Sequence, residues 1–253
     1  MEKNNADIKS NPGHGVYNRI LKYAGVFGSV QMLAMLVTLV LNKVKSVWLG
    51  PACYGITESM NRNTDVVKNL TNLGIQTVAV PEISRTVGTD ADATGDSILI
   101  TRSWALLTAI AGMAVCLLMS PFLSRWAFAG DAGYTVGFML MSFAVAAAAV
   151  TGGEMAVLRG TGLMRQVALS QLFASIVSLC LSVPLYWFFK LDGIIPALVL
   201  SALGTMTVTC CYSFRAYPYS ARPFSGQVLR KGFGMIGFGV FFTVAAFLGA
   251  WAW

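Results

Sequence analysis

The sequence has 253 residues, of which 56% are hydrophobic and only 11% charged, and its mean hydropathy is +0.65. Soluble domains usually carry about 25% charged residues, so this composition excludes an ordinary soluble domain and indicates an integral membrane protein. The net charge of +7 calls for no nucleic-acid partner, because cytoplasmic loops rich in Lys and Arg and contact with anionic lipid account for it.

Six segments are free of charge and long enough to cross a hydrocarbon core of about 30 Å as helices. They are 23–41, 104–123, 134–153, 167–189, 193–214 and 232–253. Strands of a membrane barrel would alternate in polarity, so the continuous apolarity predicts an all-α fold. The first segment could be a signal peptide, but Lys43 and Lys45 follow it rather than a small-residue cleavage site. We interpret it as a retained helix.

A seventh segment, 56–80, is polar where its surroundings are not. At about 100° per residue its eight polar side chains fall within roughly 120° of arc. They are Glu58, Asn61, Arg62, Asp65, Lys68, Asn69, Asn72 and Gln76. The opposite face is apolar or small, with Ile56, Met60, Val67, Leu70, Gly74 and Val78.

A helix of this kind inside a membrane bundle is typical of one that lines a hydrated cavity. In this interpretation Arg62 and Lys68 attract an anionic substrate, the amides of Asn61, Asn69, Asn72 and Gln76 add hydrogen bonds to it, and Glu58 and Asp65 balance the charge or bind a coupling cation. Two alternatives remain open: a structural ladder of ion pairs at i, i+3 and i, i+4, and an interfacial helix that never spans.

The distribution of Lys and Arg predicts the orientation. If 56–80 spans and the N-terminus is cytoplasmic, 12 of the 18 basic residues lie inside, 4 outside and 2 within the membrane. If 56–80 did not span, the best split would be 12 to 6 with the N-terminus outside. We therefore expect seven membrane helices and a cytoplasmic N-terminus.

Two further groups of polar residues lie near or inside predicted spans. Glu154 stands near the cytoplasmic end of the fourth span and could be a gate or an ion-coupling site, or a boundary residue bonded to Arg159 or to water. The fifth span carries Ser170, Gln171, Ser175 and Ser178. These could bind sugar hydroxyls, or serve only in the helix–helix hydrogen bonding that is common in membranes.

Signatures of catalysis are largely missing from the sequence. Its one histidine, His14, lies in the polar N-terminal stretch, no His/Cys cluster has metal-ligand spacing, and no phosphate-binding Gly-x-x-x-x-Gly-Lys-Ser/Thr motif occurs. We therefore expect a protein that is not an enzyme and uses no cofactor.

The predicted spans divide the chain into three parts. We expect a cytoplasmic tail over 1–22, of which 1–16 is disordered, a six-helix membrane lobe over 23–228, and over 229–253 the first helix of a truncated second lobe. A faint repeat supports this division, because Lys22-x-x-Gly25-x-x-Gly28 reappears as Lys231-x-x-Gly234-x-x-Gly237. We expect the chain to be the front part of a longer protein.

Three stretches resemble bacterial O-antigen and polysaccharide flippases, a family of the multidrug/oligosaccharidyl-lipid/polysaccharide exporter superfamily. Residues 45–56 (KSVWLGPACYGI) resemble the first external loop of that family. Residues 72–75 (NLGI) with 80–85 (VPEISR) resemble the end of its second helix, and 151–154 (TGGE) with Arg159-Gly160 the end of its fourth.

This resemblance implies two six-helix lobes around a central cavity in the bacterial inner membrane. It implies the flipping of an undecaprenyl-pyrophosphate-linked oligosaccharide, driven by a proton or sodium gradient, with membrane lipid, a polysaccharide polymerase and other assembly proteins as partners. It also implies that cationic cavity residues face the pyrophosphate, and here only Arg62 and Lys68 match.

Three other functions stay open at this point. The first is a multidrug antiporter of the same superfamily, in which Asp65 and Glu58 would bind organic cations and protons. The second is a membrane-embedded enzyme of lipid or glycan assembly, for which Glu154 is the one weak candidate residue. The third is a fragment that is inactive alone.

Overall fold

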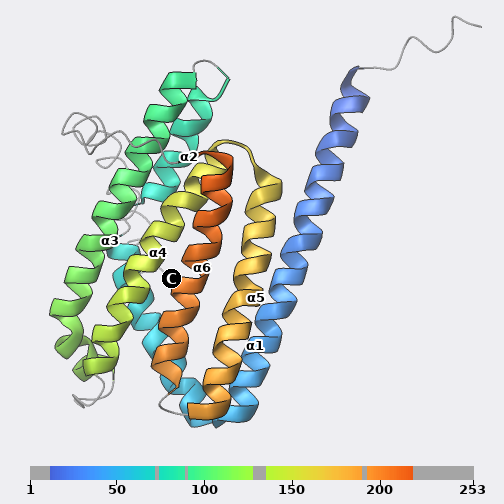
Figure 1. The fold of residues 1–253 in the computed structure, drawn as a ribbon. Helices are drawn as coiled ribbons and strands as arrows, with labels where there is room; N and C mark the ends of the chain where they lie inside the picture. The colour runs from blue at the N-terminus through green and yellow to red at the C-terminus, as the bar shows by residue number, and fades with distance from the viewer. Residues whose placement is uncertain (1–11, 72–73, 89–90, 128–134, 190–192, 219–253) are drawn as a thin grey trace, which may run out of the picture.

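A computed structural model describes residues 12–71, 74–88, 91–127, 135–189 and 193–218 of the chain, and within these ranges all regular structure is α-helical (Figure 1). The helices are α1 (Pro12–Thr71), α2 (Ile75–Thr86), α3 (Ala91–Ala127), α4 (Thr135–Gly160), α5 (Met164–Phe189) and α6 (Ile194–Ala216). Five stretches of the described part are long and apolar enough to cross a membrane: Gly28–Trp48 of α1, Asp92–Trp126 of α3, and all of α4, α5 and α6. This confirms the all-α membrane fold, while the expected span 232–253 lies outside the described residues.

Helix α1 is two helices joined at a single residue, Gly50. Its backbone has φ 75° and ψ 169°, a conformation that a residue with a Cβ adopts only with strain. Pro51 then suits the first turn of the next helix, where its missing N–H removes no hydrogen bond. Within residues 45–56, which resemble an external loop, the connection is therefore reduced to one non-helical glycine, after which the chain turns back into the bundle (Figure 1).

The polar segment expected as one helix over 56–80 is broken before its end. Gly74 has φ 63° in the left-handed region, and its carbonyl accepts the first N–H groups of α2, from Thr77 and Val78. The helical backbone resumes at Ile75 and continues to Thr86. As a result, side chains before and after the break no longer share one helical face.

Two stretches outside the predicted membrane segments are helical. Helix α1 begins at Pro12, so residues 12–16 are not disordered as expected. Helix α3 begins at Ala91 rather than near Trp104, because Ile98, Leu99 and Thr101 bury one side of its first turns. Tertiary packing of such a face contributes more to helix stability than local sequence does.

Helix α4 lies at the centre of the lobe, between α3 and α6 (Figure 1). Sixteen of its 26 residues are buried, and Gly153 and Gly160 let α3 and α2 approach its backbone closely. Residues 51–71 are joined to α3 and α4 by an apolar cluster of Met60, Cys116, Leu123 and Phe138.

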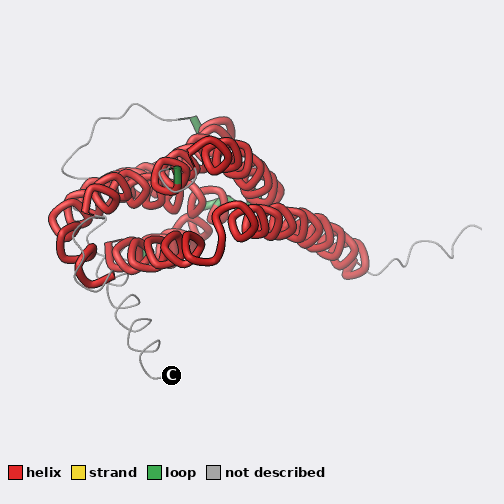
Figure 2. Tube along the Cα trace, turned by 90° about the horizontal axis from the view of Figure 1, so that it is seen from below, coloured by secondary structure: helices red, strands yellow, loops and turns green. Residues whose placement is uncertain are grey.

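The N-terminal half of α1 is the least buried part of the lobe. It packs along α5 but extends beyond the other helices when the bundle is viewed along its axis (Figures 1 and 2). Ala34 is the one buried side chain among its described residues 28–48, whereas Met32 and Met35 are 72% and 64% exposed. This apolar surface suits contact with lipid or with further helices.

Candidate functional site

The polar face predicted for the second segment is present on residues 57–69. Thr57, Met60, Thr64 and Val67 are buried against the lobe. The polar side chains lie on the other side of the helix: Arg62, Asp65 and Asn69 are exposed, and Glu58, Asn61 and Lys68 are half-buried. The structure therefore brings six of the eight polar residues together on one exposed face, which we call the charged face.

The ion pairs on the charged face do not form a continuous ladder. Lys68 Nζ lies 2.8 Å from Asp65 Oδ1, in a pair whose carboxylate is 59% exposed. Glu58 interacts electrostatically with Lys45 across the turn at Gly50. Arg62 has no hydrogen-bond or ion-pair partner among the residues that the structure describes, so its guanidinium is available to a ligand.

Gln76 is not part of this face. Gln76 follows the break at Gly74, and its amide packs so closely over Gly152 of α4 that a Cβ there would collide with it. Asn72 lies outside the described residues. The expectation that Gln76 shares a face with Arg62 is wrong, because the left-handed residue Gly74 interrupts the helical periodicity.

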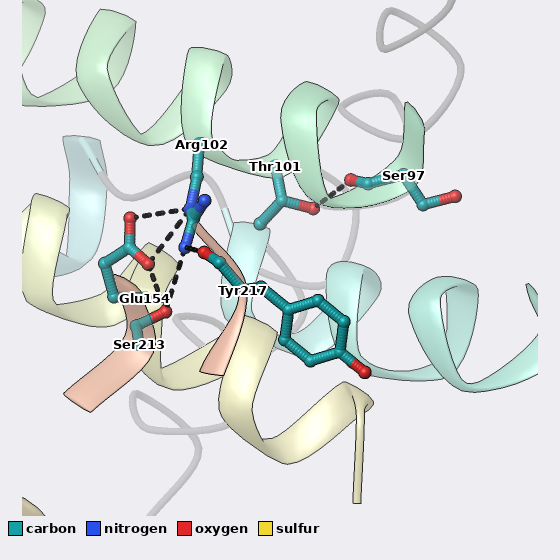
Figure 3. A network of polar contacts seen from close by, with 6 residues as sticks. All are labelled: Ser97, Thr101, Arg102, Glu154, Ser213 and Tyr217. Carbon is teal, nitrogen blue, oxygen red and sulfur yellow. Dashed lines mark hydrogen bonds and ion pairs between the residues drawn. The ribbon is translucent and has the colours of Figure 1, made fainter. Parts of the chain in front are cut away.

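Glu154 belongs to a buried network that joins three helices (Figure 3). Arg102 Nε of α3 lies 3.0 Å and 3.1 Å from the two carboxylate oxygens of Glu154 on α4. Ser213 of α6 donates its hydroxyl to Glu154 Oε2 at 2.5 Å. Arg102 Nη2 donates to Ser213 Oγ and to the carbonyl of Tyr217, both at 3.1 Å. The guanidinium also stacks 4.9 Å from the ring centroid of Phe214.

This network decides between the environments expected for Glu154. Its predicted partner Arg159 is exposed, and the carboxylate is neutralised by Arg102 instead, with both side chains at most 6% exposed. Buried charges persist when they are paired and hydrogen-bonded. A coupling ion at Glu154 would therefore have to displace Arg102.

Arg102 is the functional-site candidate that sequence reasoning missed. It lies outside the predicted membrane segments, and 52 residues separate it from its partner. The one available signal was a carboxylate inside an apolar helix, Glu154, because such a group requires a cation or a donor nearby.

A cavity of about 700 Å³ lies between part of the N-terminal half of α1 and α5. The residues that line it are Gly28, Gln31, Met32, Ala34, Met35, Thr38, Leu41, Met155, Gln171, Ala174, Ser175, Ser178 and Thr205. Three of the four polar residues noted on the fifth span therefore face a cavity. Ser170 does not, since it is buried beside Met155 and donates to the carbonyl of Val167.

Metal-binding geometry is not found among the described residues, where no three His, Cys, Asp or Glu side chains lie close enough together to hold an ion. The described cysteines 116, 180, 210 and 211 are free thiols. The arrangement of the described lobe is thus a bundle with an exposed charged face, an uncharged cavity and a buried ionic network.

No family model matches the sequence, and no curated protein matches it. Solved structures do resemble the fold. An outward-facing multidrug resistance MATE family transporter of the MOP superfamily has a TM-score of 0.64 at 16% identity, over 89% of this chain and 54% of its own. A MOP superfamily transporter from Pyrococcus furiosus, described as having a binding pocket of reverse polarity, has a TM-score of 0.63 at 16% identity, again over 89% of this chain and 54% of its own. A MATE transporter in the bent conformation has a TM-score of 0.61 at 16% identity, over 85% of this chain and 52% of its own.

These similarities concern the fold, because the identities are only 16%. The chain spans about half the length of the transporters that it resembles. Its described helices therefore share the fold of about half of each of these solved structures.

Proposed function

We propose that the chain forms one lobe of an alternating-access transporter that flips an undecaprenyl-pyrophosphate-linked oligosaccharide across the bacterial inner membrane. The observation that carries the proposal is Arg62, an exposed cation without a partner among the described residues, on a helix whose other side is packed into a membrane bundle. An arginine at the bilayer centre costs about 2.5–3.5 kcal/mol on insertion scales. A residue retained at that cost fits a role toward an anionic ligand.

The charged face supplies the chemistry that this substrate requires. Arg62 and Lys68 would hold the diphosphate through charge-assisted hydrogen bonds, which are stronger than neutral ones. Asn61 and Asn69 would add hydrogen bonds to polar groups of the substrate next to the diphosphate. The candidates for coupling to a proton or sodium ion are Asp65, Glu58 and Glu154. At Glu154 the ion would have to displace Arg102. A second lobe packed over this face would close the cavity, and rocking of the two lobes would expose it to each leaflet in turn.

The distribution of arginine along the helices supports a cytoplasmic N-terminus. Arg85, Arg159 and Arg215 lie in the last turns of α2, α4 and α6, and Arg165 lies in the first turn of α5. These helix ends meet at one end of the bundle, where α1 also begins (Figure 1). An excess of Arg at one end is typical of the cytoplasmic side.

The proposal is tested by replacing the two cations, Arg62→Ala with Lys68→Ala, in the natural host. Surface polysaccharide should be abolished while the protein still inserts at its normal level. The matched controls are Arg62→Lys with Lys68→Arg, which keep the charge, and Arg125→Ala, which removes an exposed arginine elsewhere. Normal surface polysaccharide in the double alanine variant would refute the role given to these residues.

Export of organic cations is the second candidate function. It is favoured by the structural similarity to a multidrug resistance MATE transporter and by the carboxylates on the charged face, Asp65 and Glu58. A deletion strain separates the two functions: altered dye efflux with normal surface glycan supports cation export, and lost glycan with normal efflux supports flipping.

A further inference from the structure

The cavity between α1 and α5 differs in chemistry from the charged face. The described residues that line it include no Asp, Glu, Lys, Arg or His. Uncharged hydrogen-bonding side chains enter it from three helices: Gln31 and Thr38 of α1, Gln171, Ser175 and Ser178 of α5, and Thr205 of α6. Its volume of about 700 Å³ falls within the range of about 300–1,000 Å³ that small-molecule sites occupy.

Several polar groups that line this cavity have hydrogen-bonding capacity that the described residues do not use. Oε1 of Gln171 is buried and accepts no hydrogen bond in the described part of the chain. The hydroxyls of Thr38, Ser175 and Thr205 already donate to carbonyls of their own helices, those of Ala34, Gln171 and Ala202. Their oxygen lone pairs remain open to a donor.

The cavity is poorly suited to a charged occupant. A diphosphate or an organic cation placed there would find no counter-ion among the described lining residues, and an unpaired charge at membrane depth is disfavoured. A hydroxyl-rich uncharged group fits better, since its O–H groups can donate to the hydroxyl oxygens of Thr38, Ser175 and Thr205. Its apolar C–H surfaces can pack on the adaptable side chains of Met32, Met35 and Met155.

We propose that this cavity is a binding site for an uncharged sugar unit, separate from the charged face that holds the anionic part of the same substrate. The inference that the sugar belongs to a transported lipid rests on the proposed function. The binding chemistry of the cavity does not, and it can be measured with simple amphiphiles.

The test uses the purified chain in an amphipathic polymer and three probes with the same tail: octyl β-glucoside below its micelle threshold, octyltrimethylammonium and 1-octanol. The unmodified chain should bind the glucoside more tightly than either other probe. Gln171→Leu with Ser178→Ala removes hydrogen bonds at nearly constant volume, so glucoside affinity should fall about tenfold while octanol affinity is unchanged. Ser170→Ala is the matched control, because this serine lies on the same helix outside the cavity, and it should change neither.

The remaining outcomes are equally informative. Equal binding of glucoside and octanol would show an apolar lipid site, and tighter binding of the ammonium probe would show a cation site. If the glucoside did not bind, or if Gln171→Leu had no effect on its binding, the sugar would bind elsewhere or not at all. Each of these results overturns the proposal. Gln171→Glu, a second variant of the same shape, should shift preference from the glucoside to the ammonium probe. Arg62→Ala with Lys68→Ala should leave glucoside binding intact whether or not it abolishes surface glycan. The experiment therefore distinguishes failure of the sugar-site proposal from failure of the flippase proposal.

Discussion

Arg102 and Glu154 show at the level of single residues how a buried ion pair joins helices. Removing either partner leaves the other as an uncompensated buried charge, which costs about 3–5 kcal/mol. We therefore expect Arg102→Met to lower the unfolding free energy by about that amount. Thermal unfolding of the purified variant, followed by circular dichroism, measures the change.

The double variant Arg102→Met with Glu154→Leu should recover much of the lost stability, since replacing a whole buried pair with apolar residues is often neutral. Glu82→Gln provides the exposed control. Its side chain pairs with Arg85 at 3.8 Å on the surface, and exposed pairs contribute about 0–1 kcal/mol. Equal effects of Arg102→Met and Glu82→Gln would contradict the assignment of a buried network.

At the level of whole helices, Gly153 sets how closely α3 approaches α4. A Cβ on Gly153 would overlap the methyl group of Ala105, and neither small residue can yield without the two backbones moving apart. Gly153→Ala should therefore destabilise the lobe by about 1–3 kcal/mol, as overpacking of a close-packed interface does. Chemical denaturation of the purified variant measures this loss.

Gly95→Ala is the matched control on α3. A Cβ at that position meets nothing within 4 Å, and alanine is a better helix former than glycine by about 1 kcal/mol. This variant should be neutral or slightly more stable. A Gly153→Ala variant that behaved the same way would show that the helices do not approach as closely as described.

The charged face of residues 57–69 makes a prediction about solvent access. With the native cysteines replaced, a cysteine at Arg62 or Asn69 should react with a water-soluble maleimide in intact membranes, because in the proposed transporter that side of the helix faces an aqueous space. A cysteine at Met60 or Thr64, both fully buried, should remain unlabelled. If positions 62 and 69 also resisted labelling, the face would contact lipid or protein and the transport proposal would lose its basis.

The topology of the whole molecule can be tested from its two ends. In the same cysteine-free background, Val87→Cys after α2 should be labelled from the cytoplasmic side only. Arg125→Cys in the last turn of α3 should be labelled from the opposite side only, since one membrane crossing separates the two positions. Labelling in inside-out and right-side-out vesicles measures this, and the reverse pattern would place the N-terminus outside.

Features governed by local pattern were predictable from the sequence. The uninterrupted apolar segments determined the helical membrane fold, and the 100° periodicity placed Glu58, Asn61, Arg62, Asp65, Lys68 and Asn69 on one side of a helix. Both depend on neighbours a few residues apart, and tertiary packing preserved both.

Features that depend on distant contacts were decided only by the tertiary structure. No local signal showed that Arg102 would turn inward to meet Glu154 and Ser213, because the pair gains its stability only once α3, α4 and α6 are packed and water is excluded. The break at Gly74 likewise moved Gln76 from the charged face to the surface of α4. Ser170 and Gln171, adjacent in sequence, were separated into a packing contact and a cavity wall, since their surroundings come from other helices.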